Sequence, residues 1–155
     1  METEIKYRIM RPGEEAIICS LIEKVFNEFV APEYGAEGTN EFFKFANPQA
    51  MAERASTKQV VIVAEYNSEL VGVIEMRGNN HIAILFVNHR GRGIAKELIK
   101  KAIEECRKRE QDLKKITVNS SPFAVPIYTK IGFKPTGSSQ QKNGITFVPM
   151  AYDLA

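Results

Sequence analysis

The sequence predicts one α/β domain spanning residues 1–155, built on a mixed, mostly antiparallel sheet with helices on both faces. Three observations lead to this class. A central row of three apolar, β-branched runs separated by short turn sequences is typical of an antiparallel meander. Amphipathic helical patterns stand before and after that row. A further strand pattern follows the second helix, which predicts a parallel strand reached by a right-handed crossover.

The N-terminal third is predicted to begin with a strand, because residues 3–9 alternate between apolar and polar. Apolar residues at helical spacing over 17–29 then predict a helix, and Pro32 marks its end. The pattern weakens afterwards. Residues 31–38 resemble a loop, and residues 40–56 are expected to form two short helices divided by a proline.

The rest of the chain shows clearer patterns. The expected elements are strands at 59–66, 69–77, 81–87, 114–120, 133–138 and 144–154, with helices at 91–110 and 124–131. Gly132 fits the stop of the last helix, since glycine readily adopts the left-handed conformation common there. The strands 81–87 and 114–120 should lie parallel, with pairing that is expected to be incomplete.

Composition narrows the classes of function. The chain has 44% hydrophobic and 26% charged residues, as soluble domains do, and its net charge of +2 supplies little field for general nucleic-acid binding. No apolar run reaches the roughly 20 residues that span a bilayer, and the acidic start is unlike a signal peptide. We therefore expect a cytoplasmic protein without nucleic-acid or membrane partners. Cys19 and Cys106 are expected to be buried structural thiols, and no metal site is indicated.

The segment RGRGIA joins the strand at 81–87 to the next helix. Gly91 and Gly93 lack Cβ atoms where the chain turns, so successive amides can point at one anion near a helix N-terminus. Arg90 and Arg92 can add charge-assisted hydrogen bonds. This arrangement predicts a phosphate cradle. The alternatives are an ordinary glycine-containing loop and an Arg-Gly nucleic-acid segment, although the aromatic interleaving typical of the latter is missing.

Two motifs resemble those of the Gcn5-related N-acetyltransferase (GNAT) superfamily. In FVNHRGRGIAKELI, Arg90, Gly93 and Ala95 occupy the defined positions of the family's coenzyme A signature. In NSSPFAVPIYTKIGFKP, the residues that match a second signature are Asn119, Ala124, Tyr128, Gly132 and Phe133. One strand and one helix separate the two motifs, as in the family. The resemblance covers roughly residues 59–152.

The resemblance implies an acetyl-CoA cosubstrate, bound where the strands 81–87 and 114–120 splay apart, and direct acetyl transfer to a small-molecule or peptide amine in a ternary complex. It is also compatible with a homodimer. Pantetheine would pair with the backbone of Leu85, Phe86 and Val87, and Asn119 would bond pantetheine or order water. The residues implied to hold the pyrophosphate are Arg90, Gly91, Arg92, Gly93, Ile94 and Ala95.

Amine acetylation needs an acid and a base. A lysine-like amine of pKa ~10.4 is only about one part in a thousand neutral at pH 7. Tyr128 is the family-implied acid for the departing thiolate, and its alternative role is packing under the short helix. His81 is the candidate base, expected to share a strand face with Leu85 and Val87; its alternative is a turn residue. Glu75 is the rival base, although solvent exposure is expected for it, and a water relay is the third option.

The acceptor side is left open by these motifs. The family implies that the first helices and the following loop, here roughly residues 26–45, shape it. Carboxylates there could attract a cationic amine, and aromatic rings could enclose its apolar part. The alternative is that the rings belong to the core and the carboxylates to the surface. The residues concerned are Glu33, Glu37, Glu41, Tyr34, Phe42, Phe43 and Phe45. Two other classes of function are a non-catalytic acyl-CoA sensor and an RNA-interacting module.

Overall fold

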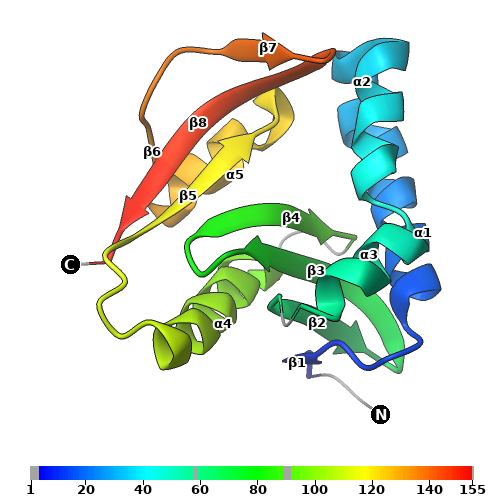
Figure 1. Cartoon of the computed structure of the whole chain (residues 1–155), viewed down its shortest axis with the longest axis vertical. Coiled ribbons are helices and arrows are strands. Elements are labelled where there is room, and N and C mark those ends of the chain that lie inside the picture. The colour runs from blue at the N-terminus through cyan, green and yellow to red at the C-terminus, as the bar shows by residue number, and fades with distance from the viewer. Residues whose placement is uncertain (1–3, 58, 89–91, 155) are drawn as a thin grey trace.

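The computed structural model describes residues 4–57, 59–88 and 92–154. One eight-stranded sheet runs in the order β1-β2-β3-β4-β5-β8-β6, with β7 paired to β8 (Figure 1). The strands are β1 (Lys6–Ile9), β2 (Val61–Tyr66), β3 (Glu69–Arg77), β4 (His81–Val87), β5 (Lys115–Ser120), β6 (Lys134–Pro135), β7 (Gln140–Lys142) and β8 (Ile145–Asp153). The helices are α1 (Glu15–Val25), the π-helix η1 (Phe26–Val30), α2 (Ala31–Phe45), α3 (Pro48–Ala55), α4 (Ile94–Arg109), the 3-10 helix η2 (Pro122–Ala124) and α5 (Val125–Ile131).

The predicted meander is confirmed. β2, β3 and β4 pair antiparallel in sequence order. Asn67 and Ser68 both have positive φ, 52° and 66°, which is the geometry of the tight two-residue turn that matches the twist of the adjoining strands.

The crossover is also confirmed, and β5 lies parallel to β4. Their pairing covers only two residue pairs, His81 with Thr117 and Ile82 with Val118. On its other edge β5 pairs with β8 along its whole length. Figure 1 shows β5 and β8 turning away from β4 beyond this short contact. The sheet is therefore continuous at one end of β4 and open at the other.

Two apolar cores lie on opposite faces of the sheet. One packs α4, together with Tyr128 and Phe133, against the sheet; the other packs α1 and Met51 of α3 against the opposite face. Cys19 and Cys106 are buried in these cores as expected, and burial raises the pKa of each thiol to about 11. Within the described residues, no helix combines the length and apolarity needed to cross a membrane.

The predictions for the region after α1 were partly wrong. Pro32 does not end the helix: α1 passes through η1 directly into α2, and Pro32 stands in the first turn of α2, where its fixed φ suits the helix. Residues 31–38 are accordingly helical, with a kink at Gly35, whose φ is 68°. The expected division at Pro48 is confirmed, because the Asn47 side chain caps α3 by accepting from the Ala50 amide at 3.0 Å.

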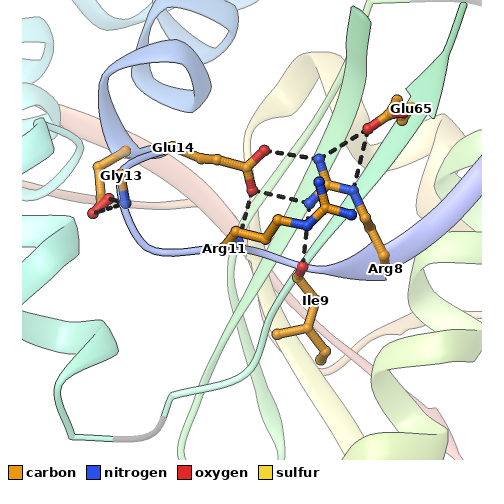
Figure 2. A network of polar contacts seen from close by, with 7 residues as sticks. Arg8, Ile9, Arg11, Gly13, Glu14 and Glu65 are labelled. Carbon is orange, nitrogen blue, oxygen red and sulfur yellow. Dashed lines mark hydrogen bonds and ion pairs between the residues drawn. The ribbon is translucent and has the colours of Figure 1, made fainter. Parts of the chain in front are cut away.

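A guanidinium clamp ties β1 to the start of α1 (Figure 2). Arg8 donates to both carboxylate oxygens of Glu14, at 2.9 and 2.7 Å, and to Glu65 on β2 at 2.9 and 3.2 Å. Glu14 also accepts from the Arg11 amide at 2.7 Å. The Arg8 hydrogen bonds, the largest cause, lower the pKa of Glu14 from 4.5 to about 2.

We expect Glu14→Gln to lower the free energy of unfolding at neutral pH. The depressed pKa corresponds to at most roughly 3 kcal/mol, and partial exposure of the pair reduces this to about 1–2 kcal/mol. Because the folded-state pKa is the lower one, this stability is fully present above pH 4.5 and is lost as the pH falls toward about 2.

Urea denaturation at a series of pH values measures this difference. Glu15→Gln is the matched control, since Glu15 accepts only from the Gly13 amide among its described hydrogen bonds. An equal loss in both variants, or a Glu14→Gln loss that persists in strong acid, would contradict the clamp.

Candidate active site

A cavity of about 730 Å³ occupies the opening between β4 and β5. This volume falls within the roughly 300–1,000 Å³ usual for small-molecule sites. Its walls come from β4 beyond His81, the end of β5, the first turn of α4, α5 with η2, Val25 of α1, and aromatic residues of η1 and α2. Because α4 and α5 lie on one face of the sheet and α1 on the other, the cavity reaches both faces.

The first turn of α4 forms one end of the cavity. Gly93 precedes the helix with φ of 68°, a conformation that suits glycine, and no atom of the described residues lies within 4 Å of where a Cβ would stand. The helical bonds begin with the Glu97 amide, which donates to Gly93 O at 3.0 Å. The amides of Ile94, Ala95 and Lys96 therefore lie in the turn that has no helical acceptors, and all three residues line the cavity. Amides in this position are suited to bind an anion, so the phosphate cradle stays a prediction that this geometry allows.

The predicted arginines are only partly placed. Arg90 and Gly91 lie outside the described residues. Arg92 is exposed and its guanidinium carbon stands 5.0 Å from the centre of the Tyr66 ring. Arg92 lines a second, more open hollow beside β1 and α4 rather than the main cavity.

Leu85, Phe86 and Val87 line the cavity, as the family pattern implied. Beyond Ile82 no β4–β5 pair is found in the described part of the chain, so this edge of β4 faces the cavity instead of a strand. Its main-chain groups are available to a ligand that carries amides of its own. Asn119, at the end of β5, also lines the cavity and is exposed.

An irregularity in β4 alters the direction of its side chains. Glu75 pairs with Ile84 but Met76 pairs with Ile82, so Ala83 is an extra residue in a β-bulge. Ile82 consequently lies on the α4 face, whereas Ile84 lies on the α1 face. The expectation that His81 shares a face with Leu85 and Val87 was therefore wrong. His81 alternates with Ile82 and is directed to the α1 face.

His81 contacts the parallel strand. Its Nδ1 lies 2.8 Å from the Thr117 hydroxyl, which in turn donates to Asn80 O at 3.3 Å. A hydroxyl has one proton, so both contacts are satisfied when Nδ1 carries a proton and Nε2 has the lone pair. Burial, followed by the Arg77 charge, lowers the pKa of His81. The ring is thus held neutral at the closed end of the opening, one residue before the cavity lining begins.

The predicted solvent exposure of Glu75 was wrong, because its side chain is only 1% exposed. It is held by Arg54 of α3, whose Nε donates to one carboxylate oxygen and whose second nitrogen donates to the other at 3.1 Å. Arg54 also donates to Phe45 O at 2.7 Å and lies 3.6 Å over the Phe45 ring. A buried carboxylate needs such a partner, and no sequence pattern indicates one 21 residues away. Glu75 does not line the cavity.

Tyr128 of α5 lines the cavity and is 5% exposed. Its ring packs edge-on against Phe133, at 5.2 Å between centroids. Burial, and then the neighbouring Tyr34, raises the pKa of Tyr128 above its ordinary value. Burial likewise raises the pKa of Tyr34 to about 12. Both phenols therefore stay protonated across the physiological range and can only act as hydrogen-bond donors or neutral acceptors.

The aromatic part of the lining was predicted only in part. Phe26, Phe29 and Phe123 line the cavity, and Phe29 stacks on Phe123 at 5.0 Å. Phe26 and Phe29 follow the same helical spacing as the core residues of α1, so their pattern alone could not separate wall from core. Of the aromatic residues predicted for the acceptor side, Tyr34 and Phe42 line the cavity.

The sequence matches the model of the acetyltransferase (GNAT) domain family over residues 30–154. A search of curated proteins found no significant match.

Solved structures agree in fold. The GCN5-related N-acetyltransferase "Aminotransferase, Class-II" of Rhodopseudomonas palustris superposes with a TM-score of 0.82 at 22% identity, covering 99% of this chain and 98% of that one. The PaiA N-acetyltransferase of Thermoplasma acidophilum, solved with coenzyme A, gives 0.79 at 15% identity over 97% and 99%. YncA of Salmonella typhimurium, solved with acetyl-CoA, gives 0.69 at 17% identity over 97% and 94%.

Proposed function

Because the chain belongs to the acetyltransferase (GNAT) family, we propose that it binds acetyl-CoA in the cavity between β4 and β5 and transfers the acetyl group directly to a primary amine. The observation that carries this proposal is the cavity itself, which joins a free helix N-terminus to an unpaired strand edge. The first suits a pyrophosphate and the second suits the amides of pantetheine. The PaiA and YncA structures, with coenzyme A and acetyl-CoA, support the same ligand.

In this proposal the cofactor lies along β4. Pantetheine pairs with the backbone of Leu85, Phe86 and Val87, with Asn119 opposite. The pyrophosphate is held by the amides of residues 90–95, assisted by Arg90 and Arg92. A main-chain amide near Leu85 donates to the oxyanion that forms on the thioester carbonyl.

Tyr128 is proposed as the group that stabilises the leaving thiolate. A thiol of pKa about 8.5 is a stronger acid than a phenol whose pKa is raised above 10. Full proton transfer from Tyr128 to sulfur is therefore uphill, and its contribution is a hydrogen bond from a group held protonated. The buried position makes that hydrogen bond stronger than it would be in water.

His81 is proposed as the base. Its Nδ1 contact with Thr117 leaves Nε2 able to accept a proton, and its side chain is directed to the α1 face, opposite the α4 cradle. Since the ring lies one residue outside the cavity lining, the proton would reach it through a bound water.

The first test is binding followed by turnover. Acetyl-CoA at about 100 times its dissociation constant should stabilise the fold by roughly 2.7 kcal/mol, raising Tm by about 5 °C or more. Thiol release should then depend on an added amine. Stabilisation without thiol release from any amine would indicate an acyl-CoA sensor and would refute the proposed transfer.

Gly93→Val should weaken acetyl-CoA binding by roughly 10-fold or more, because a β-branched residue at φ of 68° distorts the first turn of α4. Arg92→Ala should have a smaller effect, since Arg92 rests on Tyr66 outside the cavity. Isothermal titration calorimetry compares the two variants. The reverse order would show that side-chain charge, not main-chain geometry, holds the anion.

Tyr128→Phe should lower kcat by roughly 10- to 100-fold while changing acetyl-CoA affinity little, because it removes a hydrogen bond made mainly to the developing thiolate. Steady-state kinetics and cofactor titration on the same preparation separate the two effects. Activity equal to that of the unmodified protein would exclude the role.

The kcat of the unmodified protein should fall on the acidic side of pH 6.5, since the pKa of His81 is lowered from that value and only the neutral ring accepts a proton. His81→Ala should lose this acidic limb. Glu75→Gln should keep it and show a lower Tm instead, because it weakens the buried contact with Arg54. An acidic limb that is unchanged in His81→Ala would show that His81 is not the base and would favour a water relay without it.

A further inference from the structure

The two sides of the cavity differ in chemistry. On the α4 and α5 side stand the helix N-terminus, Tyr128 and two lysines, Lys96 and Lys130. On the opposite side, the wall is mostly aromatic and aliphatic, and the other polar lining residues, Asn119, Ser120 and Ser121, are uncharged. If the cofactor takes the first side, as proposed above, the acceptor amine must approach from the second.

The aromatic wall is packed into a defined shape. Phe26, which is fully buried, stacks on Phe42 at 4.3 Å and meets Tyr34 edge-on at 5.4 Å. Phe42 in turn packs on Phe86 of β4 at 5.7 Å. These contacts lock each ring against others, so the wall presents ring faces and edges to the cavity rather than adaptable polar groups.

The wall lacks acidic groups. Among the described residues that line the cavity there is no Asp or Glu, and the charged ones are both lysines. The three glutamates of α2 are not among the lining residues, and each has another contact, that of Glu33 being beside the cavity. Glu33 accepts from the Phe123 amide at 3.0 Å, Glu37 lies against the turn at Gly144, and Glu41 pairs with Lys44 at 3.4 Å.

We infer that the acceptor is a primary amine whose single amino group is carried on an aromatic or other apolar body, and that amines with several cationic groups are poor acceptors. The inference rests on the proposed transferase function. A second ammonium group would have to leave water beside rings and lysines with no carboxylate to pair with, which is costly.

The same wall favours the reactive form of the amine. An apolar environment disfavours the ammonium and lowers its pKa, so the neutral nitrogen needed for attack is more populated in the site than in water. That nitrogen forms a bond to the thioester carbonyl carbon as the C–S bond breaks. The nitrogen proton goes to the base, and the thiolate is reprotonated to the free thiol.

The test is a comparison of kcat/KM by thiol release across paired amines. Hexylamine and hexamethylenediamine share one carbon chain and differ by the second amino group. We expect hexylamine and phenethylamine to exceed hexamethylenediamine, spermidine and kanamycin by roughly 100-fold, the factor that an unpaired buried charge of a few kcal/mol produces. Equal or greater values for the diamine or for spermidine would overturn the inference.

A substitution in the wall gives a second measurement. Phe29 lines the cavity, is partly exposed, and lies on the opposite side from the α4 cradle. Phe29→Asp should raise kcat/KM for hexamethylenediamine relative to hexylamine by roughly 10-fold or more, and Phe29→Leu, the apolar control, should leave that ratio unchanged. An unchanged ratio in a Phe29→Asp protein that acetyl-CoA still stabilises would contradict an acceptor site at this wall.

The outcomes separate this inference from the function on which it rests. Thiol release that is fastest with spermidine or kanamycin would leave acetyl transfer standing and overturn the acceptor class. Acetyl-CoA-dependent stabilisation with no thiol release from any amine would refute the transfer itself, and the acceptor class with it. Because the amine panel uses the unmodified protein, its result holds even if a wall variant fails to fold.

Discussion

The cavity exists because the pairing between β4 and β5 ends after two residue pairs. A parallel pair normally continues along both strands, since each unpaired N–H and C=O in a protein interior needs another partner. Here the ladder stops after Ile82 and Val118, while β5 stays bonded to β8. The opening that results is too wide for side chains of the sheet to fill. It can exist only because α4, α5 and the α1-η1-α2 segment enclose it from both faces.

Two local backbone irregularities determine where the side chains of β4 and the first amides of α4 point around that opening. The bulge at Ala83 reverses the alternation of β4, which sends His81 to the α1 face and leaves Leu85 and Val87 on the α4 face. The left-handed conformation of Gly93 turns the chain so that the first amides of α4 end at the cavity. In the proposed function, β4 thereby serves a cofactor on one side and an acceptor on the other.

The sequence predicted the parts of the fold that follow from periodicity and turn chemistry: the meander, the crossover, the short pairing and the helix that stops at Gly132. It failed where a local signal has two structural solutions. Pro32 is as compatible with a first helical turn as with a helix end. The bulge carries no glycine or proline. The start of α4 after Gly93 could be predicted because its geometry is local, whereas the wall depends on Phe29 meeting Phe123, which lies far along the chain.

Glu75 shows why a carboxylate in an apolar strand is not by itself a catalytic sign. Both of its oxygens accept from Arg54, and its side chain is almost fully buried, so it has no route to solvent. The pair is costly to bury, and a well-packed apolar pair would give comparable stability. What an apolar pair would not give is the third contact, from Arg54 to the carbonyl of Phe45 at the end of α2. Through it β3 fixes the C-terminal end of the helix that carries Tyr34 and Phe42, so the charge buried beneath the sheet positions the apolar wall of the cavity.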